Sequence, residues 1–281
     1  MNKKKKVFAL GPREKSLISV ILFSLVVIAV MIVGKNIPDS SILPDFSNIN
    51  QAPQSDHLFG TDWMGRDMFL RTLKGLSLSI WVGLISAVTS SAIAVVLGII
   101  GPVFGGKVDS FICFMVDLVL SIPHTILVIL ISVACSGGFK GIVVGVAATH
   151  WTSLTRVIRA EIMQLKEAEY IKTAEMFGKS KLNICIHHML PHILPQLVVG
   201  TILVFPHAII HEASITFLGF GLPAHEPAIG IILSESMKYL TSGQWWLATF
   251  PGLTLVLISL AVSSVGRNLE KIIDPASAYK I

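Results

Sequence analysis

Residues Trp151 to Pro191 read WTSLTRVIRAEIMQLKEAEYIKTAEMFGKSKLNICIHHMLP, a charged island within a very apolar chain. The island begins at the end of an apolar run, continues with charges at helical spacing, breaks at Gly178 and closes at Leu190 and Pro191. A glycine at a helix end can adopt a positive φ, so we expect Gly178 to let the chain turn into a second short helix. We expect Pro191 to terminate that helix and to start the next apolar segment.

The composition is that of an integral membrane protein. Hydrophobic residues make up 53% of the chain, charged residues only 14%, and the mean hydropathy is +0.74. A soluble domain usually carries about 25% charged residues. The three cysteines share no short spacing, so they indicate neither a disulfide framework nor a zinc site. No Walker-type glycine loop is present, so any ATP must be bound by a partner.

Six apolar runs predict six membrane-spanning helices, because a span needs roughly 20 apolar residues. The fourth run is short, and we extend it from Leu154 through Ile158. We therefore expect an all-α, six-helix transmembrane domain in which the charged island forms a loop. The runs are Leu17–Val33, Leu78–Val103, Phe111–Ala134, Ile142–Leu154, Leu194–Phe217 and Leu247–Val265.

The distribution of basic residues predicts the orientation. Most of the 22 lysines and arginines precede the first run, lie in the charged loop or follow the last run. The positive-inside rule makes that side cytoplasmic, so the net charge of +5 needs no nucleic-acid partner. The first run has no clear cleavage site, so we interpret it as a retained signal anchor. The expected parts are a cytoplasmic tail (1–16), an anchor helix (17–33), an extracytoplasmic segment (34–77), a permease domain (78–265) with its loop (156–193), and a cytoplasmic tail (266–281).

The charged loop resembles the coupling loop of binding-protein-dependent ABC importer permeases. The family pattern is E-A-A, three residues, Gly, nine residues and I-x-L-P. Lys172, Thr173 and His188 depart from it. The resemblance implies that the short helix docks into a groove of an ATPase subunit, whereas the residues alone also fit a solvated helical hairpin. The matching residues are Ala174, Gly178, Leu190 and Pro191.

A second motif lies between the first two runs. Residues 60–67 read GTDWMGRD, and together with Arg71 they resemble the G-T-D-x-x-G-R-D-x-x-x-R signature of the peptide and nickel branch of those importers. Two glycines permit tight turns, and two aspartates can cap backbone N–H groups or pair with the arginines. We favour this structural role over direct substrate contact. The motif residues are Gly60, Thr61, Asp62, Gly65, Arg66 and Asp67.

Shorter matches continue the resemblance toward the C-terminus. Asp117 and Pro123 fit the family's third span, and residues 217–221 fit its S-F-L-G-x-G segment. The closing pattern G-D-x-L-R-D-x-L-D-P is matched by Gly266, Leu269, Asp274 and Pro275, whereas Arg267 stands where the pattern has Asp.

Polar residues inside the apolar runs are candidates for the substrate pathway, because charges there are costly. Asp117 can pair with a partner subunit or bond to a neighbouring helix, and we favour the second. His207 and His211 are four residues apart, so they lie on one helix face, and Glu212 follows them. Two imidazoles at that spacing suit a transient site for Ni²⁺, Co²⁺ or a metal chelate. The alternatives are hydrogen bonds across helices or a wet pore for a peptide carboxylate.

The other histidines receive structural interpretations. We expect His124 and His150 to be helix-packing residues. The histidines near the cytoplasmic end of the loop are expected to face an ATPase or lipid headgroups. They are His187, His188 and His192.

The resemblance implies one of two permease subunits of an ATP-driven importer in a bacterial inner membrane. It implies a homologous second permease, two ATPase subunits that bind ATP-Mg, and an extracytoplasmic substrate-binding protein as partners within the lipid bilayer. This chain is expected to bind no cofactor and to catalyse no reaction. The sequence favours nickel or a metal chelate as cargo, with a di- or oligopeptide as the alternative. An ion-coupled secondary transporter that uses Asp117 and Glu212 is the hypothesis from outside the family.

Overall fold

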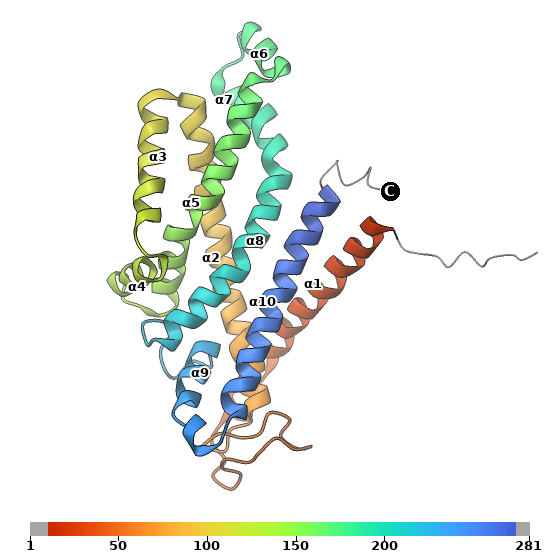
Figure 1. Ribbon diagram of the computed structural model, residues 1–281, viewed down its shortest axis with the longest axis vertical. Helices are drawn as coiled ribbons and strands as arrows, with labels where there is room; N and C mark the ends of the chain where they lie inside the picture. The colour runs from red at the N-terminus through yellow and green to blue at the C-terminus, as the bar shows by residue number, and fades with distance from the viewer. Residues whose placement is uncertain (1–10, 274–281) are drawn as a thin grey trace, which may run out of the picture.

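The computed structural model describes residues 11–273 and is built from helices (Figure 1). Within that range the only extended pairing is one isolated β-bridge between Thr61 and Asp67. Short 3₁₀ helices occur at Asp39–Ile42 and Leu240–Ser242. The α-helices are α1 (Pro12–Asn36), α2 (Met68–Phe104), α3 (Gly106–Ser121), α4 (His124–Ala134), α5 (Gly138–Glu167), α6 (Glu169–Met176), α7 (Lys181–Ile184), α8 (Leu190–Phe217), α9 (Ile229–Met237) and α10 (Trp246–Ile273).

Four of the described helices are long and apolar enough to cross a membrane, and a broken helix pair raises the number to five. The four are α1, α2, the continuous helix Lys181–Phe217 and α10. The fifth combines α3 with α4, which meet at an angle of 99°. Helix α5, the expected fourth span, is not among them, because its second half carries the charges of the island.

The single helix expected over Phe111–Ala134 is wrong. The chain is extended at Ile122 (φ −91°, ψ 136°) and at Pro123 (φ −53°, ψ 120°), and α4 starts only at His124. Proline has no N–H to continue the helix and disfavours helical backbone in the residue before it. The bend therefore follows from the sequence Ile122-Pro123, and it turns α4 across the bundle (Figure 1).

Helix α2 forms the centre of the bundle and contacts α1, α5 and α8. Helix α10 lies beside both α1 and α8, while α4 packs on α5 (Figure 1). Segment 37–67 and α9 lie at one end of the molecule, and α6 and α7 lie at the other (Figure 1). The apolar outer face of α1 is exposed, as a helix that faces lipid requires.

Glycines allow the close approach of α4 to α5. A Cβ atom at Gly141 would stand 2.6 Å from the carbonyl oxygen of Ser132, and one at Gly145 would stand 2.8 Å from that of Val128. Small residues four apart on one face allow helix backbones to pack closely in membranes. This packing holds Val128 and Ser132 of α4 against the first turns of α5.

The charged island is helical up to Gly178 as expected, except that the chain is extended at Ala168 (ψ 137°), which separates α5 from α6. Helix α6 ends at Met176, and Gly178 has φ +74° before α7 begins. The expectation that Pro191 terminates the second helix is wrong, because α7 passes through a π-helical turn (Cys185–Met189) into α8. Leu190 N–H donates to the carbonyl of Cys185, five residues earlier, which is the spacing of a π-helix. Pro191 lies in the first turn of α8, where its missing N–H costs no helical hydrogen bond.

Candidate functional site

The tip of the α6–α7 loop presents large apolar side chains to solvent. Met176, Phe177 and Leu182 are 88%, 82% and 68% exposed. They surround Gly178, which is itself exposed and has open space where a Cβ would stand. Such a cluster at the end of a protruding loop is suited to contact another protein.

The base of the same loop is anchored in the molecule. Ala174 is buried together with Ile171 and Ile184, and these side chains join one apolar cluster with residues of α2, α5 and α8. Leu190 is half-buried against this cluster, whereas Pro191 is exposed. Of the four residues that match the family's coupling loop, Ala174 and Leu190 therefore hold the loop in place, while Gly178 shapes its tip.

The GTDWMGRD motif forms a buried ionic network at one end of the bundle. Asp62 is fully buried and accepts hydrogen bonds from Arg66 Nε and Arg71 Nη1, both at 2.7 Å. Arg71 also bonds Glu235 of α9 at 3.0 Å. The network thus connects segment 37–67 to α2 and α9, as the structural interpretation of the motif expects.

The rest of the motif positions the backbone. Asp67 caps α2 by accepting from Leu70 N–H at 2.9 Å, and its other oxygen lies 2.8 Å from His57 Nδ1. Thr61 Oγ1 accepts from Gln51 N–H at 2.9 Å. Gly60 and Gly65 have φ of +70° and +73°, so both expected turns occur. Next to this motif, hydrogen bonds from Ser47 and Asn48 lower the pKa of Asp45.

A cavity of about 370 Å³ gathers four histidines from three helices. His124 comes from the start of α4, His150 from α5, and His207 and His211 from α8. Thr149, Thr152 and Ser153 add hydroxyl groups, and no carboxylate is among the described residues that line the cavity. The bend at Pro123 and the close packing of α4 on α5 place His124 there.

Three of these imidazoles form a compact cluster. One ring nitrogen each of His124, His150 and His211 lies within 4.8 Å of the other two. Ring centroids are separated by 4.5 Å between His124 and His150, and by 4.4 Å between His124 and His211. His207 lines the same cavity but is exposed and stands outside this cluster. The structure thus groups His211 with two histidines that the sequence suggested were helix-packing residues.

The two acidic candidates lie elsewhere. Glu212 is completely buried and accepts from Thr216 Oγ1 at 2.9 Å, so it points away from the cavity of its neighbour His211. Asp117 is exposed and pairs with Arg156 Nη2 of α5 at 2.5 Å, which agrees with the expected bond to a neighbouring helix. Neither is brought together with the histidines.

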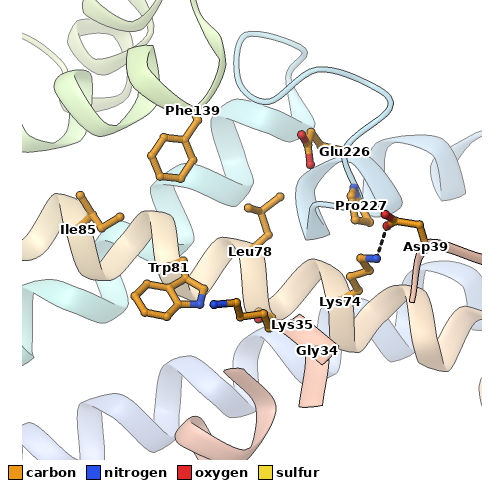
Figure 2. Close-up of a pocket in the computed structure, with 11 residues that line it drawn as sticks. Gly34, Lys35, Asp39, Lys74, Leu78, Trp81, Ile85, Phe139, Glu226 and Pro227 are labelled. Atoms are coloured by element: carbon orange, nitrogen blue, oxygen red, sulfur yellow. Dashed lines mark hydrogen bonds and ion pairs between the residues drawn. The ribbon is translucent and has the colours of Figure 1, made fainter. Parts of the chain in front are cut away.

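A second cavity of about 550 Å³ lies between α1, α2 and the loop before α9 (Figure 2). Trp81 and Phe139 form apolar walls, and Lys74 pairs with Asp39 at its edge (Figure 2). Lys74 also donates to the Ile37 carbonyl at 3.0 Å. Because Lys74 is already paired and no candidate residue from the sequence lines it, this cavity offers weaker grounds for a substrate site.

Comparison with known proteins agrees with the membrane fold, and the family match includes the α6–α7 loop. A model of the family described as "Binding-protein-dependent transport system inner membrane component" matches residues 94–277. The dipeptide transport system permease protein DppC of Bacillus subtilis (strain 168) is 31% identical over 85% of this chain and 74% of its own length. The oligopeptide transport system permease protein OppC of the same strain is 32% identical over 81% and 74%. OppC of Mycobacterium bovis is 32% identical over 83% and 80%.

Proposed function

Because this chain belongs to the binding-protein-dependent transport system inner membrane components, we propose that it is a permease subunit of an ABC importer that carries di- or oligopeptides. The family match over residues 94–277 is the observation that carries this proposal. The chain is a transport subunit and not an enzyme. Its relatives are named as dipeptide and oligopeptide permeases, which supports the peptide cargo that the sequence placed second.

The proposed assembly contains a second, homologous permease and two ATPase subunits. The ATPases bind ATP-Mg, since this sequence has no phosphate-binding glycine loop. A substrate-binding protein delivers cargo on the outer side of a bacterial inner membrane. This chain then contributes half of the pore and binds no cofactor.

The proposed topology has six spans, with both termini and the α6–α7 loop in the cytoplasm. Helix α5 is the fourth span along the chain and completes the six, because it runs through the bundle beside α2 and reaches the loop (Figure 1). Basic residues of α5 and of the loop support a cytoplasmic location for that end, while the GTDWMGRD network lies at the opposite, outer end.

The loop between residues 156 and 193 is the proposed coupling device. The exposed apolar residues Met176, Phe177 and Leu182 provide a contact surface for an ATPase subunit. Because α6 and α7 are anchored to the same apolar cluster as α5 and α8, movement of the tip would be passed to those two helices. Both helices carry histidines of the cavity, so ATP-driven motion would change the shape of the substrate path.

Nickel or a metal chelate is the second candidate cargo. The observation that favours it is the cavity with His207 and His211, which the sequence assigned to a transient metal site. In the peptide interpretation, the same imidazoles would donate hydrogen bonds to a peptide carboxylate. Asp117 and Glu212 stay hypotheses for the substrate path.

Uptake by cells tests the cargo. A strain that lacks the gene for this chain should lose uptake of a radiolabelled dipeptide and regain it when the gene is restored. Uptake of a free amino acid by another transporter provides the control. Dipeptide uptake that is unchanged by loss of the gene would contradict the peptide proposal, and loss of radiolabelled nickel uptake alone would favour the metal.

A further inference from the structure

The histidine cavity combines donors for a transition metal with a lining, among the described residues, that has no acidic group. We propose that His124, His150 and His211 form a three-imidazole site that binds a divalent transition metal carried by a small anionic chelator. The inference rests on the proposed function, because it assigns the cavity to the path of the imported molecule. It goes beyond the pair His207 and His211 by replacing His207 with His124 and His150 as ligands, and by giving the chelator an anionic charge.

Hydrogen bonding leaves the imidazoles able to coordinate. The Nδ1 atom of His150 lies 2.9 Å from the Val146 carbonyl oxygen, which can only accept, so Nδ1 carries the proton. In the neutral ring, which is the form that binds metals, the Nε2 atom is then unprotonated and has a free lone pair. This bond from one ring nitrogen to a carbonyl is the usual way in which proteins orient a metal-binding histidine.

The other two rings have no competing partner among residues 11–273. His124 Nδ1 is buried without a hydrogen bond, a costly state for a polar atom in an apolar region. Within the same range, His211 also makes no hydrogen bond through its ring. Three neutral imidazoles whose nitrogens lie within 4.8 Å of one another can share one cation as ligands. Imidazole suits nickel, copper and zinc.

The cavity is larger and less charged than a bare ion requires. A water molecule takes about 30 Å³, whereas the cavity measures about 370 Å³. No aspartate or glutamate of the described chain lines it, so a bare divalent cation would introduce an uncompensated charge into the membrane interior. A chelator with carboxylate groups would neutralise this charge and fill the space. Amino-acid-like and peptide-like molecules have these groups, which agrees with the peptide permeases among the relatives.

Metal binding to the assembled transporter tests the site. The complex is purified with an affinity tag that contains no histidine and is titrated with Co²⁺ in the presence of glycylglycine as the anionic chelator, because the absorption of Co²⁺ changes on imidazole coordination. Each of His124→Gln, His150→Gln and His211→Gln should weaken binding by at least about 10-fold. His225→Gln, at an exposed loop position, should leave it unchanged. Absence of saturable binding to the wild type, or equal binding by the three variants and the wild type, would overturn the site.

A second measurement needs no substitution. Ni²⁺ with glycylglycine should protect His124, His150 and His211 from modification by diethyl pyrocarbonate, as read by mass spectrometry, and should not protect His225. Ni²⁺ alone should protect them less, and equal protection would contradict the anionic chelator. Dipeptide uptake by cells is measured separately, so that failure of the metal site and failure of the importer proposal are distinguished.

Discussion

At the scale of single residues, Gly178 determines how the loop tip is presented. Its φ of +74° is strained for residues with a Cβ, and valine there would cost about 1–2 kcal/mol. No atom lies within 4 Å of the position that a Cβ would take, so the cost is one of backbone conformation alone. We expect Gly178→Val to abolish transport while the protein still inserts and assembles. Gly178→Asn should retain most activity, because asparagine tolerates this conformation.

Uptake and ATPase activity of the reconstituted complex, measured side by side, check this prediction. Valine and asparagine have side chains of comparable size, and the position has open space, so a difference between the two variants reports backbone conformation and not side-chain size. Wild-type uptake by Gly178→Val would show that the tip conformation does not matter for coupling.

Loss of the Asp62 carboxylate should strongly destabilise the end of the molecule that holds the GTDWMGRD network. Asp62 is fully buried between Arg66 and Arg71, so Asp62→Ala would leave two guanidinium groups with Glu235 as their one remaining carboxylate in the described network. Breaking a buried ion pair by removing one partner costs about 3–5 kcal/mol. Thermal unfolding of the purified complex should show a clear decrease in Tm. Asp56→Ala, at an exposed position of the same segment, should change little, and equal effects would contradict the structural role of the network.

At the scale of helices, the contact between α4 and α5 depends on glycine. A methyl group at Gly145 would stand 2.8 Å from a backbone carbonyl of α4, which cannot move away alone. Gly145→Ala should therefore destabilise by about 1–3 kcal/mol and weaken Co²⁺ binding through displacement of His124. Gly252→Ala in α10 is the control, because its nearest neighbour is a leucine methyl at 3.7 Å and alanine favours the helix. Equal Tm values for both variants would contradict this packing.

The sequence predicted the breaks and turns within these elements better than the way in which the helices continue and pack together. The helix break at Gly178 and the turns at Gly60 and Gly65 were predictable, because a positive φ leaves a local signal. The bend at Pro123 also had a local signal, the proline itself, but the apolar run continues on both sides of it and led to the prediction of a single helix. The continuity through Pro191 depends on a π-helical turn, for which no simple residue pattern exists.

The candidate site shows the same limit. Spacing within one helix placed His207 and His211 on a common face, and both do line one cavity. It could not show that His124 and His150 join them, because those contacts depend on the bend and on packing between three helices. Each of the four histidines lies in or beside an apolar run, so its local sequence did not distinguish a ligand from a packing residue.

At the scale of the whole molecule, the orientation can be tested by cysteine labelling. In a variant without the three native cysteines, a cysteine at Ser55 should react with an impermeant reagent from outside the cell. One at Ser180, on the α6–α7 loop, should react only after permeabilisation. Ser277, which lies outside the described residues, should behave as Ser180 does. External labelling at Ser180 would reverse the proposed topology and remove the basis for coupling.

The central claim is that ATP hydrolysis by partner subunits drives import through this chain. Its most direct test is uptake of a labelled dipeptide into proteoliposomes that contain both permeases and both ATPases, with the binding protein on the outer side. We predict uptake that requires enclosed ATP-Mg, requires the binding protein, and persists when proton and sodium gradients are dissipated. Uptake that proceeds without ATP and stops when those gradients are removed would contradict the account and favour an ion-coupled transporter.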